Sequence, residues 1–342
     1  MSNSPIESFK THSNYIRAFA LLVYDPTLLR RNQMYATISQ RIHGAKIIPN
    51  ARRDDLDLNQ IQRSLHTAWG TETLLQASNR FANEEEILRL SNNWSAVQVY
   101  YVFYHSAQAL HCAHGHPRPE SHPRTQNVFF DQWANRRLML APWSFAYGSQ
   151  GVINVPDGHV ADETIHSWSN CEGDNVFSLA AKSLMTTRRD ALHECRKRLR
   201  DRKLQQRRRA WRAVEEVRHA EGRRPRKEPD FPLPQLTDEE ITASDHDMRP
   251  YTIMDYLYRL RLKTNYEDSN MFTDGPENEI DSRSVRNALC RIAGGTLLLY
   301  EIMIRALIGS RLFDEWVQAW VAHNVPDAHE SGLATRIEYH RV

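Results

Sequence analysis

Residues 92–115, NNWSAVQVYYVFYHSAQALHCAHG, decide the fold class of this 342-residue chain. Apolar and aromatic side chains recur there every three or four residues, and others fill most of the remaining circumference. A helix that is apolar on nearly all sides is buried among other helices, so we expect this one to be the central helix of a bundle. Gly115 and Pro117 are expected to end it.

The flanking segments also have helical patterns. Thr252-Ile-Met-Asp255 is a capping-box pattern, and the apolar positions that follow recur at spacings of four and three, which predicts a helix over about 252–266. Residues 286–309 predict a last long helix. Between these parts, residues 144–160 contain Gly, Pro and Asn residues that are typical of turns, a pattern compatible with one short β-hairpin. The sequence therefore predicts an all-α protein, an antiparallel helical bundle around one core.

The order of these segments suggests how the chain is divided. A proline-rich stretch at 222–240 is typical of a linker or an extended crossover between helical parts. We expect five regions: an N-terminal helical region (1–90), the first half of the bundle (91–135), an insertion (136–248), the second half of the bundle (249–323) and a frayed tail (324–342).

The insertion contains a concentrated positive charge. Residues 187–227 contain 17 lysines and arginines against 6 acidic residues, a net charge of +11, which leaves −9 for the remainder of the chain. No proline or glycine interrupts residues 179–221, so a single helix about 60 Å long is expected there at roughly 1.5 Å per residue. Such a segment is the electrostatic footprint of a contact with nucleic acid or another anionic surface.

Arginine predominates over lysine in this helix, and guanidinium groups suit bidentate contacts with phosphate. We expect binding to be driven by the nucleic-acid backbone and to be sensitive to salt. An acidic protein partner, a solvated structural helix and a membrane surface are the alternatives. The residues expected to contact nucleic acid are Arg196, Arg200, Lys203, Arg207, Arg208, Arg209 and Arg212.

Bulk properties exclude several classes of protein. The most apolar stretch, 296–309, contains Glu301 and Arg305 and is too short to span a bilayer. No N-terminal stretch has the pattern of a secretory signal, and the four cysteines form no C-x-x-C pair. We therefore expect a cytoplasmic protein that needs no cofactor.

Two separated blocks resemble the HEPN superfamily (higher-eukaryote-and-prokaryote nucleotide-binding domains). Residues 99–122 are similar to the family's first core helix and the loop after it, and residues 257–272, LYRLRLKTNYEDSNMF, are similar to a later element that precedes the last helix. The matching positions of the first block are Tyr100, Tyr101, Tyr104, His105, Ala109, Leu110, Gly115, Pro119 and His122.

The resemblance implies a helical bundle that forms homodimers. Some members of the family are metal-independent RNases of toxin–antitoxin and antiviral systems, and others only bind nucleotides or protein partners. The chain is accordingly expected to bind nucleic acid, RNA in preference to DNA. The alternative is a non-catalytic subunit that docks an acidic protein through the basic insertion.

Catalytic members of the family use an arginine followed after four to six residues by a histidine. At the matching positions this chain has Arg259 with Thr264 and Arg261 with Tyr266, and histidine is absent from both. The resemblance therefore leaves open whether the chain is an enzyme. Our hypothesis is a polar groove at the dimer face lined by Arg259, Arg261, Asn265 and Tyr266.

Arg261 and Tyr266 could also have purely structural roles. Arg261 could form an ion pair with Glu267 or Asp268 that supports the turn, and Tyr266 could be a packed aromatic residue with a satisfied hydroxyl. An arginine–histidine pair with the required spacing also occurs at Arg188 and His193, an alternative active site within the basic helix.

The segment 111–122 is rich in histidine, which raises the question of a metal site. Its spacings differ from those of known zinc sites. Histidines near a helix C-terminus also complement the helix dipole. We therefore expect no metal.

Overall fold

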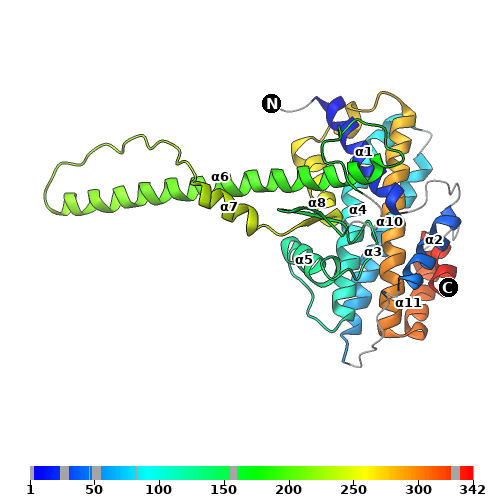
Figure 1. Ribbon diagram of the computed structural model, residues 1–342. Coiled ribbons are helices and arrows are strands. Elements are labelled where there is room, and N and C mark those ends of the chain that lie inside the picture. The colour runs from blue at the N-terminus through cyan, green and yellow to red at the C-terminus, as the bar shows by residue number, and fades with distance from the viewer. Residues whose placement is uncertain are drawn as a thin grey trace.

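The computed structural model describes residues 4–23, 31–45, 47, 55–81, 84–154, 160–324 and 332–341. Helices form a packed body, and one long helix projects from it (Figure 1). The body contains α1 (Pro5–Val23), α2 (Arg31–Gly44), α3 (Leu58–Ala77), η1 (Ser78–Phe81), α4 (Glu85–Ala113), α5 (His122–Phe129), η2 (Phe130–Ala134), α8 (Ile253–Leu262), η3 (Lys263–Glu267), α9 (Met271–Asp274), α10 (Glu279–Ile308), α11 (Ser310–Asn324), α12 (Gly332–Arg336) and η5 (Ile337–Arg341). The predominance of helix is as predicted.

The helix predicted over 92–115 is the centre of this body, as α4. It packs against α3, α10 and α8, and the side chains of Tyr100, Phe103 and Ala107 are fully buried. It begins seven residues before the predicted start, with Glu85 and Glu86 in its first turn, where negative charge complements the helix dipole. Its end is close to the prediction, because Gly115 adopts a positive φ of 78° just beyond it.

The predicted hairpin is present and belongs to a small sheet. β1 (Ala146–Gly148) pairs antiparallel with β2 (Gly151–Ile153), with Ala146 opposite Ile153. A third strand, β3 (Tyr251–Thr252), pairs with the other edge of β1 and was not predicted. It leads directly into α8, where Thr252 and Asp255 form the predicted capping box.

The basic helix is α6 (Asn175–Ala220), 46 residues long, which corresponds to about 69 Å at roughly 1.5 Å per residue. Its first part is anchored in the body by buried Leu179, Leu184 and Leu192. The remainder projects away, and the chain returns from its tip to α7 (Asp238–His246), which lies beside α6 (Figure 1). We call residues 193–237, the outer part of α6 and the returning segment, the arm.

The C-terminal part differs from the frayed tail that was expected. Residues 325–331 lie outside the described residues, but α12 and η5 are folded onto the bundle. Leu333, Arg336 and His340 are buried there. In the part of the chain that the structure describes, no helix combines the length and apolarity needed to cross a membrane.

Candidate nucleic-acid interface

The two blocks that resemble one family lie side by side. The guanidinium of Arg261, in the last turn of α8, lies over the rings of Tyr100, Tyr101 and Tyr258, with distances of 5.7, 5.2 and 5.7 Å to the ring centres. Tyr258 precedes Arg261 by three residues, so both project from the same face of α8, whereas the other two tyrosines come from α4. We call these four residues and His122 the arginine–tyrosine cluster.

His122 enters the cluster from the start of α5. Its Nδ1 is 2.7 Å from the hydroxyl of Tyr100, and its ring centre is 4.6 Å from that of Tyr104 and 5.5 Å from that of Tyr258. Burial lowers the pKa of His122, and the positive charge of Arg261 lowers it further. The imidazole is therefore mostly neutral at pH 7, the form that can accept a proton.

A second histidine borders the cluster. The ring of His105 stacks on that of Tyr101 with centres 5.8 Å apart. Burial, with a contribution from the charge of Arg118, lowers the pKa of His105 to about 4. Two neutral imidazoles and one guanidinium thus lie around the same tyrosine rings.

Arg261 has no carboxylate partner among the described residues, which contradicts the ion pair considered for it. That role belongs to Arg259, which pairs with Glu267 and lies 3.9 Å from Asp190 of α6. A half-buried guanidinium without a counter-ion is able to bind an anion, and the aromatic rings keep this one in place by cation–π attraction.

The other two members of the predicted groove are peripheral. Tyr266 is 73% exposed, so the packed aromatic residue considered as an alternative is also wrong. Asn265 is half-buried in η3, a wide helical turn that follows α8. The structure thus brings Arg261 into contact with α4 and leaves Arg259, Asn265 and Tyr266 outside the arginine–tyrosine cluster.

Arg188 and His193 do not form a site. Arg188 is 3% exposed and donates to Oδ1 of Asp245 at 2.6 Å and to the carbonyl oxygens of Asp245 and Met248. These bonds attach the end of α7 to the root of α6. His193 is exposed to solvent.

Four of the seven cations predicted to contact nucleic acid are engaged within the protein. Arg196 donates to Ser244 Oγ and to the carbonyl oxygen of Ile241, and Lys203 pairs with Glu240, so both hold α7. Arg208 and Arg212 pair with Glu228 at 3.7 and 3.1 Å, which holds the returning segment of the arm against α6.

The other three, Arg200, Arg207 and Arg209, have no carboxylate partner among the described residues. Lys197, Arg198 and Arg202 are exposed and likewise unpaired within that part of the chain, and they were not among the residues predicted to contact nucleic acid. Arg198, Arg202 and Arg209 are spaced by four and seven residues, so they share one face of α6. That spacing is the signal by which they could have been found.

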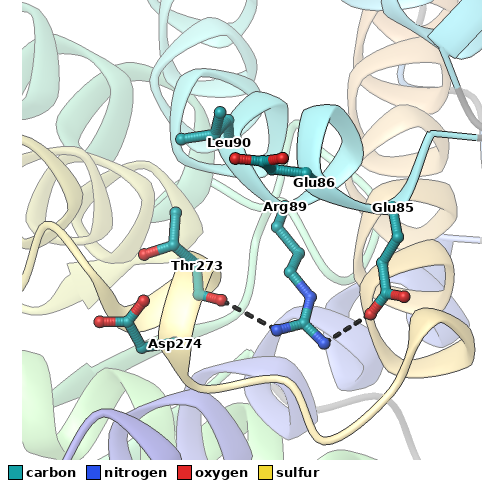
Figure 2. Close-up of a pocket in the computed structure, with 6 residues that line it drawn as sticks. All are labelled: Glu85, Glu86, Arg89, Leu90, Thr273 and Asp274. Carbon is teal, nitrogen blue, oxygen red and sulfur yellow. Dashed lines mark hydrogen bonds and ion pairs between the residues drawn. The ribbon is translucent and has the colours of Figure 1, made fainter.

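A pocket of about 490 Å³ between α4 and α9 does not suit a polyanion. It is lined by Glu85, Glu86, Arg89, Leu90, Thr273 and Asp274 (Figure 2). Its single cation, Arg89, donates to Glu85 Oε1 at 2.6 Å and to the carbonyl oxygen of Thr273. The lining thus has three carboxylates against one cation, a net negative charge that repels phosphate.

The histidine-rich segment has structural contacts. His111 stacks on His116 with ring centres 4.8 Å apart, and its Nδ1 is 2.9 Å from Gln132 Oε1. Cys112 is buried, and burial raises the pKa of its thiol to about 11. Within the described ranges, no group of three or more His, Cys, Asp or Glu side chains is arranged to hold a metal ion.

In comparisons with known proteins, no family model, curated protein or solved structure matches this chain.

Proposed function

We propose that this protein is a HEPN-like, homodimeric nucleic-acid-binding protein whose ligand is RNA rather than DNA. The observation that carries the proposal is the row of exposed cations on the projecting part of α6 for which the described residues offer no carboxylate partner. Cations that point into solvent from an isolated helix release counterions when they meet phosphates, which gives binding without sequence preference. Lys203 and Arg212 of the same helix attach α7 and the returning segment to it through ion pairs with Glu240 and Glu228.

The arginine–tyrosine cluster is the second contact in this proposal. Arg261 would bind one phosphate, and a base would extend the stack that the half-exposed rings of Tyr101 and His105 form with each other. Stacking of this kind contributes roughly 1–3 kcal/mol per base and accepts every base. The ligand that uses both contacts is single-stranded, because bases in a duplex are not free to stack on side chains.

Metal-independent RNA cleavage is the second candidate function, and one observation favours it. His122 and Arg261 lie on the same two rings, those of Tyr100 and Tyr258, although they come from different parts of the chain. A neutral histidine can accept a proton, and an arginine can stabilise the charge that develops on phosphorus oxygens.

The proposal is tested by measuring the affinity of the purified protein for a labelled single-stranded RNA, and for DNA of the same sequence, at increasing salt. We expect tighter binding to RNA and an affinity that falls steeply between low and physiological salt. A flat salt profile would contradict the proposal. Shortened RNA in the presence of a chelator indicates cleavage, and intact RNA indicates binding alone. If neither binding nor cleavage occurs, the acidic protein partner replaces nucleic acid as the ligand of the arm.

Replacing Arg261 by alanine is expected to weaken RNA binding about tenfold, equivalent to about 1.4 kcal/mol, because one charge-assisted phosphate contact is lost. Arg261→Lys should recover only part of this affinity, since lysine keeps the charge but not the planar group that lies over the tyrosines. Fluorescence anisotropy measures both variants.

Arg259→Ala is the matched control, because it removes an arginine two positions away that is already neutralised by Glu267. It should leave RNA affinity within about twofold of wild type, since a paired surface cation contributes little. Equal losses for Arg259→Ala and Arg261→Ala would mean that the arginine–tyrosine cluster has no special role.

A further inference from the structure

A pocket of about 200 Å³ lies between α1 and α10, two helices that pack against each other in the body (Figure 1). Lys10 of α1 pairs with Glu277, just before α10 begins, and Val23 at the end of α1 lies against Gly295 of α10. The two helices therefore run in the same direction, and the pocket lies between these two contacts. We call it the α1–α10 pocket.

Each helix contributes one of its faces to this pocket. Arg17 and Ala20 of α1 are three residues apart, and Asn287 and Ala288 of α10 lie one turn before Arg291. Side chains at these spacings share a helix face. The methyl groups of the buried Ala20 and Ala288 are too small to fill the space between the helices, which leaves a hollow with an arginine from each side.

The polar side chains around the hollow are hydrogen-bond donors. Arg17 and Arg291 each have five N–H donors, and Ser284 and Asn287 add a hydroxyl and an amide group. Among the described residues, no carboxylate lines the pocket and none pairs with Arg17. Burial lowers the pKa of Arg291, because its charge is partly removed from water, and a bound anion offsets that cost. The pocket thus favours a negatively charged ligand.

We propose that the α1–α10 pocket binds a small phosphate-bearing ligand, either inorganic phosphate or the phosphate monoester of a small molecule. The guanidinium groups of Arg17 and Arg291 contact the phosphate oxygens from the two helices, and Ser284 and Asn287 donate to the oxygens that remain. A carboxylate suits this donor set less well, because one arginine can already occupy both of its oxygens. The volume is below the roughly 300–1,000 Å³ of pockets for drug-sized molecules, which limits the organic part to a few atoms.

The α1–α10 pocket shares no residue with the arm or with the arginine–tyrosine cluster, and the arm projects away from α10 (Figure 1). The inference therefore goes beyond the proposed RNA binding and does not depend on it. Replacing both Arg17 and Arg291 by alanine should leave salt-dependent RNA binding in place, because the arm is unchanged. RNA titrations and phosphate titrations test the two proposals separately.

The first test is isothermal titration calorimetry of the full chain with inorganic phosphate, glycerol 3-phosphate and acetate at constant ionic strength. We expect one saturable phosphate site per chain, with a Kd on the order of 1 mM or below, and acetate binding at least about tenfold weaker. Tighter binding of glycerol 3-phosphate than of phosphate identifies a monoester as the ligand, and equal or weaker binding identifies inorganic phosphate. A chain without a saturable site, or equal binding of acetate, would overturn the proposal.

The second test removes the two arginines. Arg17→Ala combined with Arg291→Ala should weaken phosphate binding about a hundredfold, at roughly tenfold for each lost charge-assisted contact. Lys10→Ala combined with Arg283→Ala is the matched control, since it removes two cations from the same helices that are already paired with Glu277 and Glu279. The control should stay within about twofold of wild type. Equal losses in the two double variants would show that the pocket is not the site.

A third variant keeps both arginines. Asn287 is exposed, so Asn287→Glu should fold, because glutamate is a good helix former at such a position. The new carboxylate lies four residues before Arg291, where it pairs with that arginine and repels phosphate. We expect phosphate binding at least about tenfold weaker, whereas the neutral Asn287→Gln should retain it. An Asn287→Glu chain with normal circular dichroism that binds phosphate as tightly as wild type would contradict the assignment.

Discussion

Changing Arg198, Arg202 and Arg209 together to glutamate is expected to weaken RNA binding on the order of tenfold to a hundredfold at physiological salt. The three guanidinium groups share one face of α6, and no carboxylate of the described chain neutralises them. Each phosphate contact to a single strand contributes about 0.7 to the slope of log affinity against log salt, so the slope should decrease by about 2. Anisotropy titrations at several salt concentrations measure both quantities.

The control must change the net charge by the same amount elsewhere. Arg63, Arg136 and Arg311 are exposed on the body, and reversing all three gives a matched variant. We expect this variant to lose a small part of its affinity through long-range electrostatics, with little change in slope. Equal losses for the two triple variants would mean that net charge, and not the arm, attracts RNA. Circular dichroism should show that both variants keep their helix content.

The cations of the arm fall into two groups: those paired within the protein maintain the structure of the arm, and those unpaired among the described residues are available to a ligand. Arg196, Lys203, Arg208 and Arg212 hold α7 and the returning segment, so reversing them would alter the structure of the arm as well as its charge. Reversing the unpaired cations Arg198, Arg202 and Arg209 instead changes the charge of the arm without removing contacts that maintain its structure.

The fold was predictable where local pattern determines it. The apolar circumference of 92–115, the uninterrupted run that became α6 and the capping box of Thr252 with Asp255 all depend on residues within a few positions of one another. The third strand was missed because Tyr251 and Thr252 are too short a pattern to recognise without their partner, β1.

The site was less predictable, because its contacts join distant residues. Arg261 was selected, but its tyrosine partners on α4 lie about 160 residues earlier in the chain and no local pattern connects them. The pairing of Glu228 with Arg208 and Arg212 depends on how the returning segment folds back, which its prolines do not specify. Position in a long basic helix therefore did not distinguish structural from free cations.

A buried ion cluster at the C-terminus also escaped the sequence analysis. Arg336 is fully buried and donates to Glu72 and to both carboxylate oxygens of Glu301, at 3.0 and 2.7 Å for the latter. Trp69 Nε1 and His340 Nε2 contact the same carboxylate at 2.9 and 2.8 Å. Glu72 is separated from Arg336 by 264 positions, so only the folded chain shows that these charges meet.

Arg336→Ala is expected to lower the free energy of unfolding by about 3–5 kcal/mol, because it leaves two buried carboxylates without their counter-ion. Urea denaturation monitored by tryptophan fluorescence measures the change. Arg311→Ala is the control, since Arg311 pairs with Glu315 on the surface, and it should change stability by about 1 kcal/mol or less. A loss as small as the control's would mean that the cluster is not part of the folded core.

The pH dependence of the stability lost in Arg336→Ala tests whether Glu301 is responsible for that loss. Burial alone would raise the pKa of Glu301, but Arg336 and His340 outweigh it and lower the pKa from 4.5 to about 2. In wild type, the stability contributed by this carboxylate is therefore complete above pH 4.5 and is lost as the pH falls towards 2. Without Arg336, burial dominates and raises the pKa, so protonation of Glu301 should stabilise the folded variant. The difference in unfolding free energy between wild type and Arg336→Ala should consequently become smaller as the pH is lowered from 7 to 4. A difference that stays constant over this range would show that the loss of stability does not come from a buried Glu301 carboxylate without its counter-ion.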